Sequence, residues 1–185
     1  MVVVLQGKGR PGFIRLALFL LLPLVFTGCA SRQARVIDTT AYCGCGQCCS
    51  WERGNWYFFY LDFWNRYVSK GPARGRVYTG LTASGIDPGE PVPGLFSYDS
   101  FQRPWLLPVR VVFPWLWLPQ DGTIAADTQY YPFGTRMLVP GWGWGMVLDR
   151  GAAIKGPDRI DLFFDSHQDA LAWGRRKLKV EIEPR

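Results

Sequence analysis

The sequence predicts a mainly β protein, a small barrel of short strands with one short helix. Twenty-one glycines and 14 prolines in 185 residues favour short strands joined by turns over an all-helical fold. Short apolar runs bounded by glycine or proline recur through the C-terminal half. Short strands of this kind close around one core, so we expect a barrel. The expected strands lie at residues 35–42, 123–126, 136–139, 146–148, 159–164 and 177–183.

The first 28 residues carry the pattern of an export signal. Three basic residues precede an apolar run at residues 16–26, which is too short for a membrane span of about 20 residues. Phe-Thr-Gly-Cys resembles a bacterial lipobox, and this resemblance implies cleavage before Cys29 and a lipid on its thiol. An ordinary signal peptide or a short uncleaved anchor is the alternative. Residues 29–34 then form a short linker, and residues 35–185 form the domain.

The expected location is outside the cytoplasm. Ala30 and Ser31 follow the cysteine with no aspartate, which resembles lipoproteins that a two-membrane bacterium sends to its outer membrane, facing the periplasm. The formal charge is +6, but part of it lies in the signal and the rest is spread along the chain, which argues against a nucleic-acid partner. The expected partner at this end is the membrane, through the lipid on Cys29.

Four more cysteines directly follow the first expected strand, namely Cys43, Cys45, Cys48 and Cys49. In an exported protein disulfide pairing is the default, although bridges inside so tight a loop are strained, above all one between the adjacent Cys48 and Cys49. Thiolates at this spacing also suit tetrahedral zinc, but there is no second cysteine pair and the single histidine, His167, is far away in the sequence. Local disulfides are therefore favoured, and a metal site is the alternative.

Two aromatic segments occupy the middle of the chain. Residues 55–68 place aromatic side chains at helical spacing, which predicts a helix packed on the core, with sugar stacking as the functional alternative. Residues 76–85 predict a strand that ends in a small-residue turn. Prolines exclude a regular helix through residues 86–120, so we expect a surface insertion with an edge strand at residues 109–113. Its tryptophans suit membrane headgroups or glycan, or packing on the domain itself; they are Trp105, Trp115 and Trp117.

Three widely spaced aspartates, Asp127, Asp149 and Asp161, each lie beside an expected strand. Carboxylates at strand ends are costly to bury unless they are paired or solvated at a site. We therefore expect the three to meet at one pocket, with turn capping as the alternative, above all for Asp127. The chain after them continues with a capping box at Ser166, a short helix that stops at Gly174, and the final strand.

The C-terminal half of the chain carries several ordered motifs, namely TASG (82–85), GTIAADTQYYPFGT (122–135), VPGWGWG (139–145), DRGAAIKGPDRIDLFFD (149–165) and ALAWGRRKLKVEI (170–182). They resemble the 3D domain, a family named for three aspartates that shares its fold with the catalytic domain of membrane-bound lytic transglycosylase A. The resemblance implies a six-stranded double-psi β-barrel with a short helix and an aromatic-rich helical or loop insertion. Two departures stand out: Ala152 replaces a glycine of the family's D-x-G-G-A-I-K-G loop, and the insertion at residues 86–120 is unusually long.

The resemblance also implies an activity, lytic transglycosylase-type cleavage of the β-1,4 bond between N-acetylmuramic acid and N-acetylglucosamine in peptidoglycan, with a 1,6-anhydro product. Asp161 is the expected acid/base, Asp149 is expected to tune it, and Asp127 to hold the site or the sugar. An acid of this kind needs a pKa raised by burial or by a neighbouring carboxylate. No metal or cofactor is expected for this reaction. The residues expected to contact the glycan are Thr82, Ser84, Lys155 and Arg159.

Two other functions remain open from the sequence. One is a non-catalytic peptidoglycan-binding envelope lipoprotein that keeps the barrel and adheres through its aromatic insertion. The other is a thiol- or metal-dependent envelope protein built on the cysteine cluster.

Overall fold

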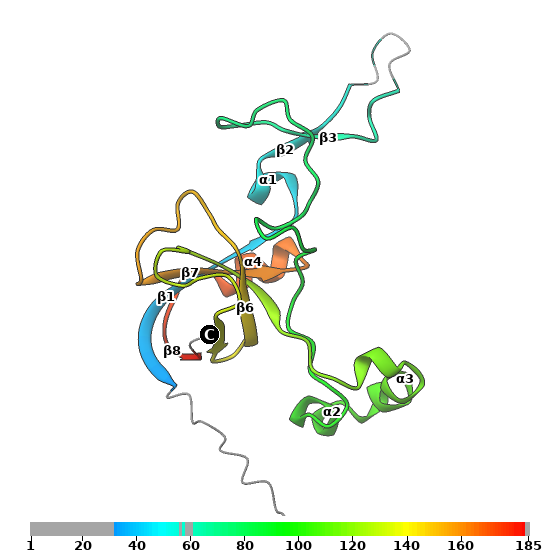
Figure 1. The fold of residues 1–185 in the computed structure, drawn as a ribbon. Coiled ribbons are helices and arrows are strands. Elements are labelled where there is room, and N and C mark those ends of the chain that lie inside the picture. Colours follow the sequence, from blue (N-terminus) through cyan, green and yellow to red (C-terminus); the bar gives the residue numbers. More distant parts are fainter. Residues whose placement is uncertain (1–31, 56, 58–60, 184–185) are drawn as a thin grey trace, which may run out of the picture.

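Six strands close into one barrel in the computed structural model, which describes residues 32–55, 57 and 61–183 (Figure 1). Around the barrel the order is β1, β7, β4, β6, β5, β8 and back to β1. The pairs β1–β7 and β4–β6 are parallel and the others antiparallel. The mainly β, six-stranded barrel is thus confirmed, and its mixed pairing is in keeping with the double-psi arrangement. The strands are β1 (Gln33–Cys43), β4 (Gly122–Ala126), β5 (Arg136–Val139), β6 (Gly143–Asp149), β7 (Arg159–Phe164) and β8 (Arg176–Glu183).

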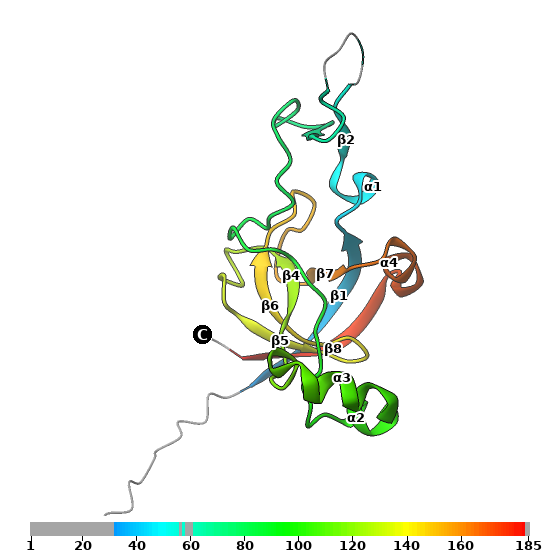
Figure 2. The ribbon, with the colours of Figure 1, turned by 90° about the vertical axis from the view of Figure 1, so that its right-hand side faces the viewer.

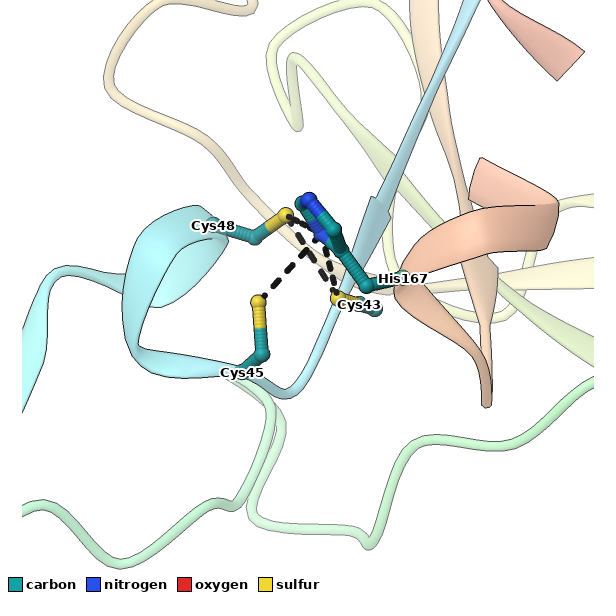
Figure 3. Close-up of side chains that lie close together, drawn as sticks. All are labelled: Cys43, Cys45, Cys48 and His167. Carbon is teal, nitrogen blue, oxygen red and sulfur yellow. Dashed lines mark hydrogen bonds between the residues drawn. The ribbon is translucent and has the colours of Figure 1, made fainter. Parts of the chain in front are cut away.

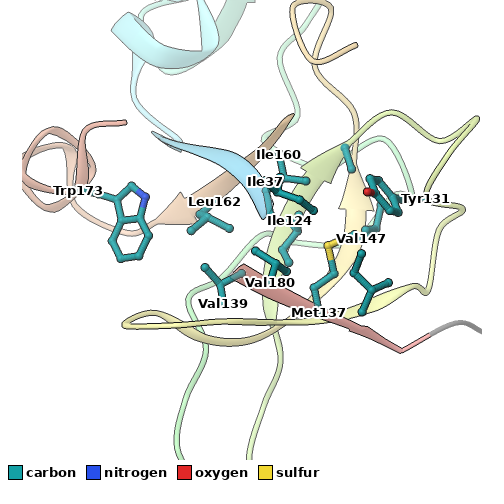
Figure 4. Close-up of a cluster of buried hydrophobic side chains, with 12 residues drawn as sticks. Ile37, Ile124, Tyr131, Met137, Val139, Val147, Ile160, Leu162, Trp173 and Val180 are labelled. Carbon is teal, nitrogen blue, oxygen red and sulfur yellow. The ribbon is translucent and has the colours of Figure 1, made fainter. Parts of the chain in front are cut away.

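The inward faces of these strands make one apolar core (Figure 4). In β5, Met137 and Val139 are fully buried while their neighbours are half-exposed, and β8 buries Val180 and Ile182 in the same alternation. This period of two is what a strand with one buried face requires. Strand β4 is buried at every position, and the segment before the insertion lies against it, since the N–H of Thr123 donates to the Gly89 carbonyl at 2.8 Å.

Helix α4 (His167–Trp173) connects β7 to β8 as predicted. The Ser166 hydroxyl accepts hydrogen bonds from the backbone N–H groups of Gln168 and Asp169, so the serine N-cap of the predicted capping box is confirmed. Gly174, with φ of 62°, ends the helix. Trp173 is buried against the barrel and its indole N–H donates to the Thr39 hydroxyl at 3.3 Å.

A second group of elements extends from the end of β1 (Figures 1 and 2). It contains the short helix α1 (Gly46–Cys49) and a two-stranded sheet of β2 (Trp51–Arg53) and β3 (Arg66–Val68). The helix expected over residues 55–68 is wrong for its described part, because residues 61–65 form turns and β3 follows. The strand expected over residues 76–85 is reduced to a single bridge between Tyr67 and Val77, because this stretch has no strand partner beyond that point.

The insertion at residues 86–120 lies at the other end of the barrel (Figure 2). It leaves and returns through a bridge between Val92 and Gln120. The edge strand expected at residues 109–113 is wrong, since α3 occupies it, and Pro104, Pro108 and Pro114 stand at helix starts, where proline is tolerated. The elements are α2 (Tyr98–Gln102), η2 (Pro104–Leu106), α3 (Leu107–Val112) and η3 (Pro114–Leu116). Exposed fractions of 69%, 63% and 47% place Trp105, Trp115 and Trp117 at its surface.

The predicted export signal and the predicted lipid site at Cys29 lie outside the described residues. Within the described part, no helix is both long and apolar enough to cross a membrane.

Candidate functional site

Two of the three predicted aspartates flank one residue of the barrel, Ala125. Strand β4 lies between β6 and β7, and Ala125 pairs with Asp149 on one side and with Asp161 on the other. Ile124 pairs with Val147, so an unbroken register would pair Ala125 with Leu148. The register shifts between Ile124 and Ala125, and Ala125 pairs with Asp149 instead. Irregularities of this kind re-aim side chains beside sites. Here the shift places Asp149 and Asp161 on opposite sides of β4, each paired with the same residue.

Asp149 is held by three donors. Its Oδ2 accepts the hydroxyl of Tyr42 at 3.0 Å, and its Oδ1 accepts the backbone N–H groups of Ala83 at 2.9 Å and Arg150 at 2.8 Å. Burial, followed by the charge of Asp149 and the hydrogen bond to it, raises the pKa of Tyr42, so this hydroxyl keeps its proton and stays a donor. The carboxylate of Asp149 is therefore fixed in position.

The turn at residues 82–85 supplies one of these donors. Thr82 is buried, and its hydroxyl donates to the Ile86 carbonyl at 2.8 Å and accepts the Ile86 N–H at 3.1 Å. The N–H of Ser84 donates to the Leu148 carbonyl at 3.1 Å, which ties the turn to the end of β6. Of the two predicted glycan contacts in this turn, Thr82 is buried with its hydroxyl bonded to the backbone of Ile86, and Ser84 is half-exposed.

Asp161 has a different environment from Asp149. Burial raises its pKa, the neighbouring Thr40 hydroxyl and Arg159 guanidinium lower it, and the charge of Asp149 raises it, with a net upward shift. Its Oδ1 is buried and has no hydrogen-bond partner among the described residues. A carboxyl group in this setting keeps its proton to a higher pH than an ordinary aspartate.

Arg159 stands two positions before Asp161 on β7, and so on the same face of the strand. Its Nε is also buried without a hydrogen-bond partner among the described residues. Of the residues expected to contact glycan, Arg159 is therefore the one that the structure brings beside Asp161. Lys155 is exposed and lines a separate pocket.

Asp127 is held by hydrogen-bond partners of its own, different from those of Asp149. Its carboxylate accepts the backbone N–H groups of Gln129 at 3.1 Å and Gly156 at 2.9 Å. These bonds, followed by the charge of Lys155, outweigh burial and lower the pKa of Asp127. The carboxylate therefore binds the turn after β4, through Gln129, and the loop between β6 and β7, through Gly156. It lies beside a pocket of about 470 Å³ lined by residues such as Gly151 and Lys155. Turn capping, the alternative for Asp127, describes what it does here.

The cysteine cluster forms a second candidate site (Figure 3). The four cysteines of this cluster are free, so the favoured local disulfides are not formed in this structure. The Sγ atoms of Cys43 and Cys48 are 3.5 Å apart, far beyond a disulfide bond of about 2.05 Å. Cys49 turns away and donates to the Cys43 carbonyl. His167 faces the other three cysteines, although its distance along the sequence had argued against it.

His167 was missed because only the barrel brings it near. Cys43 pairs with Phe164 at the ends of the parallel strands β1 and β7, and α4 begins three residues after that pair. The sequence carries one signal of this proximity, the capping serine that places a helix start, and so the histidine, directly after β7.

Comparison with known proteins finds a family match in the C-terminal part of the chain. Residues 122–182 match the 3D domain family. The "Putative cell wall shaping protein YabE" and the "Cell wall-binding protein YocH", both of Bacillus subtilis (strain 168), are each 38% identical to this chain over 64 residues. Each alignment covers 35% of this chain, but only 16% of YabE and 22% of YocH, so the likeness concerns one part of those proteins.

Among solved structures, MltA from E. coli aligns with 36% of this chain and 25% of its own, at 23% identity and a TM-score of 0.29. The family match covers five of the six barrel strands and α4, together with all three aspartates. Residues 122–182 of this chain are a 3D domain.

Proposed function

We propose that this protein acts on the glycan strands of peptidoglycan as a lytic transglycosylase. The bond cleaved is the β-1,4 linkage between N-acetylmuramic acid and N-acetylglucosamine, and the product carries a 1,6-anhydro ring. The single observation that carries the proposal is the carboxyl of Asp161, whose pKa is raised by burial and whose Oδ1 has no hydrogen-bond partner among the described residues. The names of YabE and YocH, which refer to the cell wall, support the substrate class.

One carboxyl group suffices for this reaction because the substrate supplies the nucleophile. Asp161 donates its proton to the glycosidic oxygen as the C1–O bond breaks, and the N-acetylglucosamine end leaves as an alcohol. The resulting carboxylate then takes the proton of the C6 hydroxyl, whose oxygen bonds to C1 of the same sugar. Asp161 ends the cycle protonated, and no water is consumed.

Asp149 serves this cycle as a fixed charge. Its interaction with Asp161 helps to raise the pKa of the acid, and three hydrogen-bond donors keep it from rotating away. A fixed negative charge also stabilises the positive character that develops at C1. Arg159 is positioned to orient the glycan and keeps the pKa of Asp161 from rising further.

A second candidate function is wall adhesion without catalysis. The observation that favours it is the insertion at residues 86–120, whose surface exposes large apolar side chains, among them Phe96 at 95% and Phe101 at 86%. Aromatic rings of this kind suit stacking on sugars. The printed name of YocH, a cell wall-binding protein, points the same way.

The cellular setting forms part of the proposal. A lipid on Cys29 would hold the protein at a membrane, with the barrel in the periplasm of a two-membrane bacterium and the outer membrane as its site. Strand β1 begins at Gln33, four residues after Cys29, and the exposed tryptophans of the insertion suit the membrane interface. The test is the mass of the exported protein, which rises by a diacylglyceryl group in the wild type and not in Cys29→Ala.

The activity is tested by incubating the full chain with purified peptidoglycan and measuring anhydro-muropeptides. We expect release by the wild type and a loss of at least about 100-fold in Asp161→Asn, the scale of a missing general acid. Asp87→Asn is the matched control, because Asp87 is exposed and makes no hydrogen bond or ion pair in the described part. Full activity in Asp161→Asn would refute the assignment. If the wild type pellets with the wall and releases nothing, adhesion is the function.

A further inference from the structure

Three sulfurs and one ring nitrogen surround a common centre at the end of β1. The Sγ atoms of Cys43, Cys45 and Cys48 each lie 3.5 Å from Nδ1 of His167. All four atoms lie within 4.8 Å of one another. We call these four residues the Cys3His cluster; Figure 3 shows their side chains converging from β1, α1 and α4.

Hydrogen bonding does not explain this convergence. A neutral imidazole nitrogen either donates one hydrogen or accepts through one lone pair. Nδ1 of His167 therefore satisfies one thiol at a time, yet three sulfurs stand at the same distance from it. Three thiols at one distance from a ring nitrogen, with all four atoms within 4.8 Å of one another, form the arrangement of a coordination shell.

The distances agree with tetrahedral zinc. Zn–S bonds of about 2.3 Å and Zn–N bonds of about 2.0 Å place sulfur and nitrogen about 3.5 Å apart and two sulfurs about 3.8 Å apart. The three observed S–N distances are 3.5 Å and the Cys43–Cys48 distance is 3.5 Å. Three thiolates and one imidazole are also a preferred ligand set for structural zinc, and soft sulfur ligands exclude magnesium and calcium.

The backbone around the cluster is shaped to hold it. A Cβ at Gly46 would stand 2.5 Å from the carbonyl oxygen of Trp51, so the chain can close here only on glycine. Ser50 takes the left-handed conformation with φ of 50° to end α1. The Trp51 indole N–H donates to the Gly44 carbonyl at 2.9 Å. The loop that carries Cys45 and Cys48 is thus folded tightly on itself.

We propose that this protein binds one structural zinc ion through the Cys3His cluster of Cys43, Cys45, Cys48 and His167. Each thiol loses its proton to solvent on binding, and the four protein ligands close the coordination sphere, so the ion is structural. It joins the end of β1, helix α1 and helix α4. It also fixes the residue next to Tyr42, the donor to Asp149, and so links the metal to the aspartate pair. The proposal stands independently of the glycan chemistry.

The test is the metal content of the full chain purified from an exporting bacterial host. We expect one zinc per chain and, after denaturation with a chelator, free thiols at Cys43, Cys45, Cys48 and Cys49. Cys45→Ser and His167→Asn should each lose most of the zinc. Cys49→Ser is the matched control that should retain it, because Cys49 lies beside the cluster but bonds to the Cys43 carbonyl.

A second measurement covers variants that fail to fold. Cobalt(II) added to the reduced, zinc-free wild type should produce one equivalent of thiolate-to-cobalt charge-transfer absorption together with tetrahedral d–d bands, and zinc should displace both. The proposal would be overturned if the purified protein contained no metal, had a mass two hydrogens lower per disulfide than the reduced chain, and gave no cobalt spectrum after reduction. Disulfides would then be the native state of these cysteines. Loss of zinc in Cys49→Ser with retention in His167→Asn would overturn the ligand set.

Discussion

The hydrogen bond between Tyr42 and Asp149 offers a direct measure of how firmly the aspartate pair is held. The change is Tyr42→Phe, which removes one hydroxyl and keeps the ring that packs edge-on against Phe163 at 5.4 Å. A hydrogen bond to a charged acceptor contributes about 1.5–3 kcal/mol. Asp149 keeps the N–H donors of Ala83 and Arg150, so its carboxylate is not left unpaired and the lower part of that range applies. We expect a loss of about 1.5 kcal/mol.

The assay is urea unfolding of the full chain, followed by tryptophan fluorescence. With a slope of about 1–3 kcal/mol per molar urea, a loss of this size lowers the midpoint by roughly 0.5–1.5 M. The same change made in an Asp149→Ala background closes a double-mutant cycle, which isolates the pair from the ring packing. We expect the hydroxyl to matter little in that background. A coupling energy near zero would refute the reasoning that Tyr42 holds Asp149.

Three further changes test the surrounding geometry. Because the pKa of Asp161 is raised in the folded state, the wild type loses stability as pH rises from the ordinary aspartate pKa of about 3.9 through the raised value. Asp161→Asn should lack that loss, so its thermal midpoint should rise relative to that of the wild type between acidic and neutral pH. Thermal midpoints that change with pH in the same way in both proteins would contradict the raised pKa. Gly156→Ala should cost about 1–2 kcal/mol in urea unfolding because φ is +81° there, although a Cβ meets nothing within 4 Å; a neutral effect would show that the loop relaxes. Ala152→Gly should lower stability by about 0.4–1 kcal/mol, because Ala152 is not in the positive-φ region; a gain would mean that the family glycine is needed at this position.

Local patterns predicted the barrel well. Strands β5 and β7 have the predicted bounds, and α4 begins after its capping serine. These elements follow from the alternation of buried and exposed residues and from caps within a few positions of one another. The same reasoning was wrong in the segments that follow β1. Aromatic residues at helical spacing in residues 55–68 lead into β3, because pairing with β2 outweighs the local pattern.

The sequence by itself determined the class of fold, the order of the barrel strands along the chain and the identity of the three aspartates. Only the tertiary structure decided which of them meet. Asp149 and Asp161 are brought opposite one residue because β4 lies between their strands and a register shift pairs Asp149 with Ala125. The carboxylate of Asp127 accepts the N–H of Gly156. His167 reached the cysteines in the same way, through the parallel pairing of β1 with β7. Pairings between residues more than 100 positions apart depend on closure of the whole barrel, which no short window of the chain encodes.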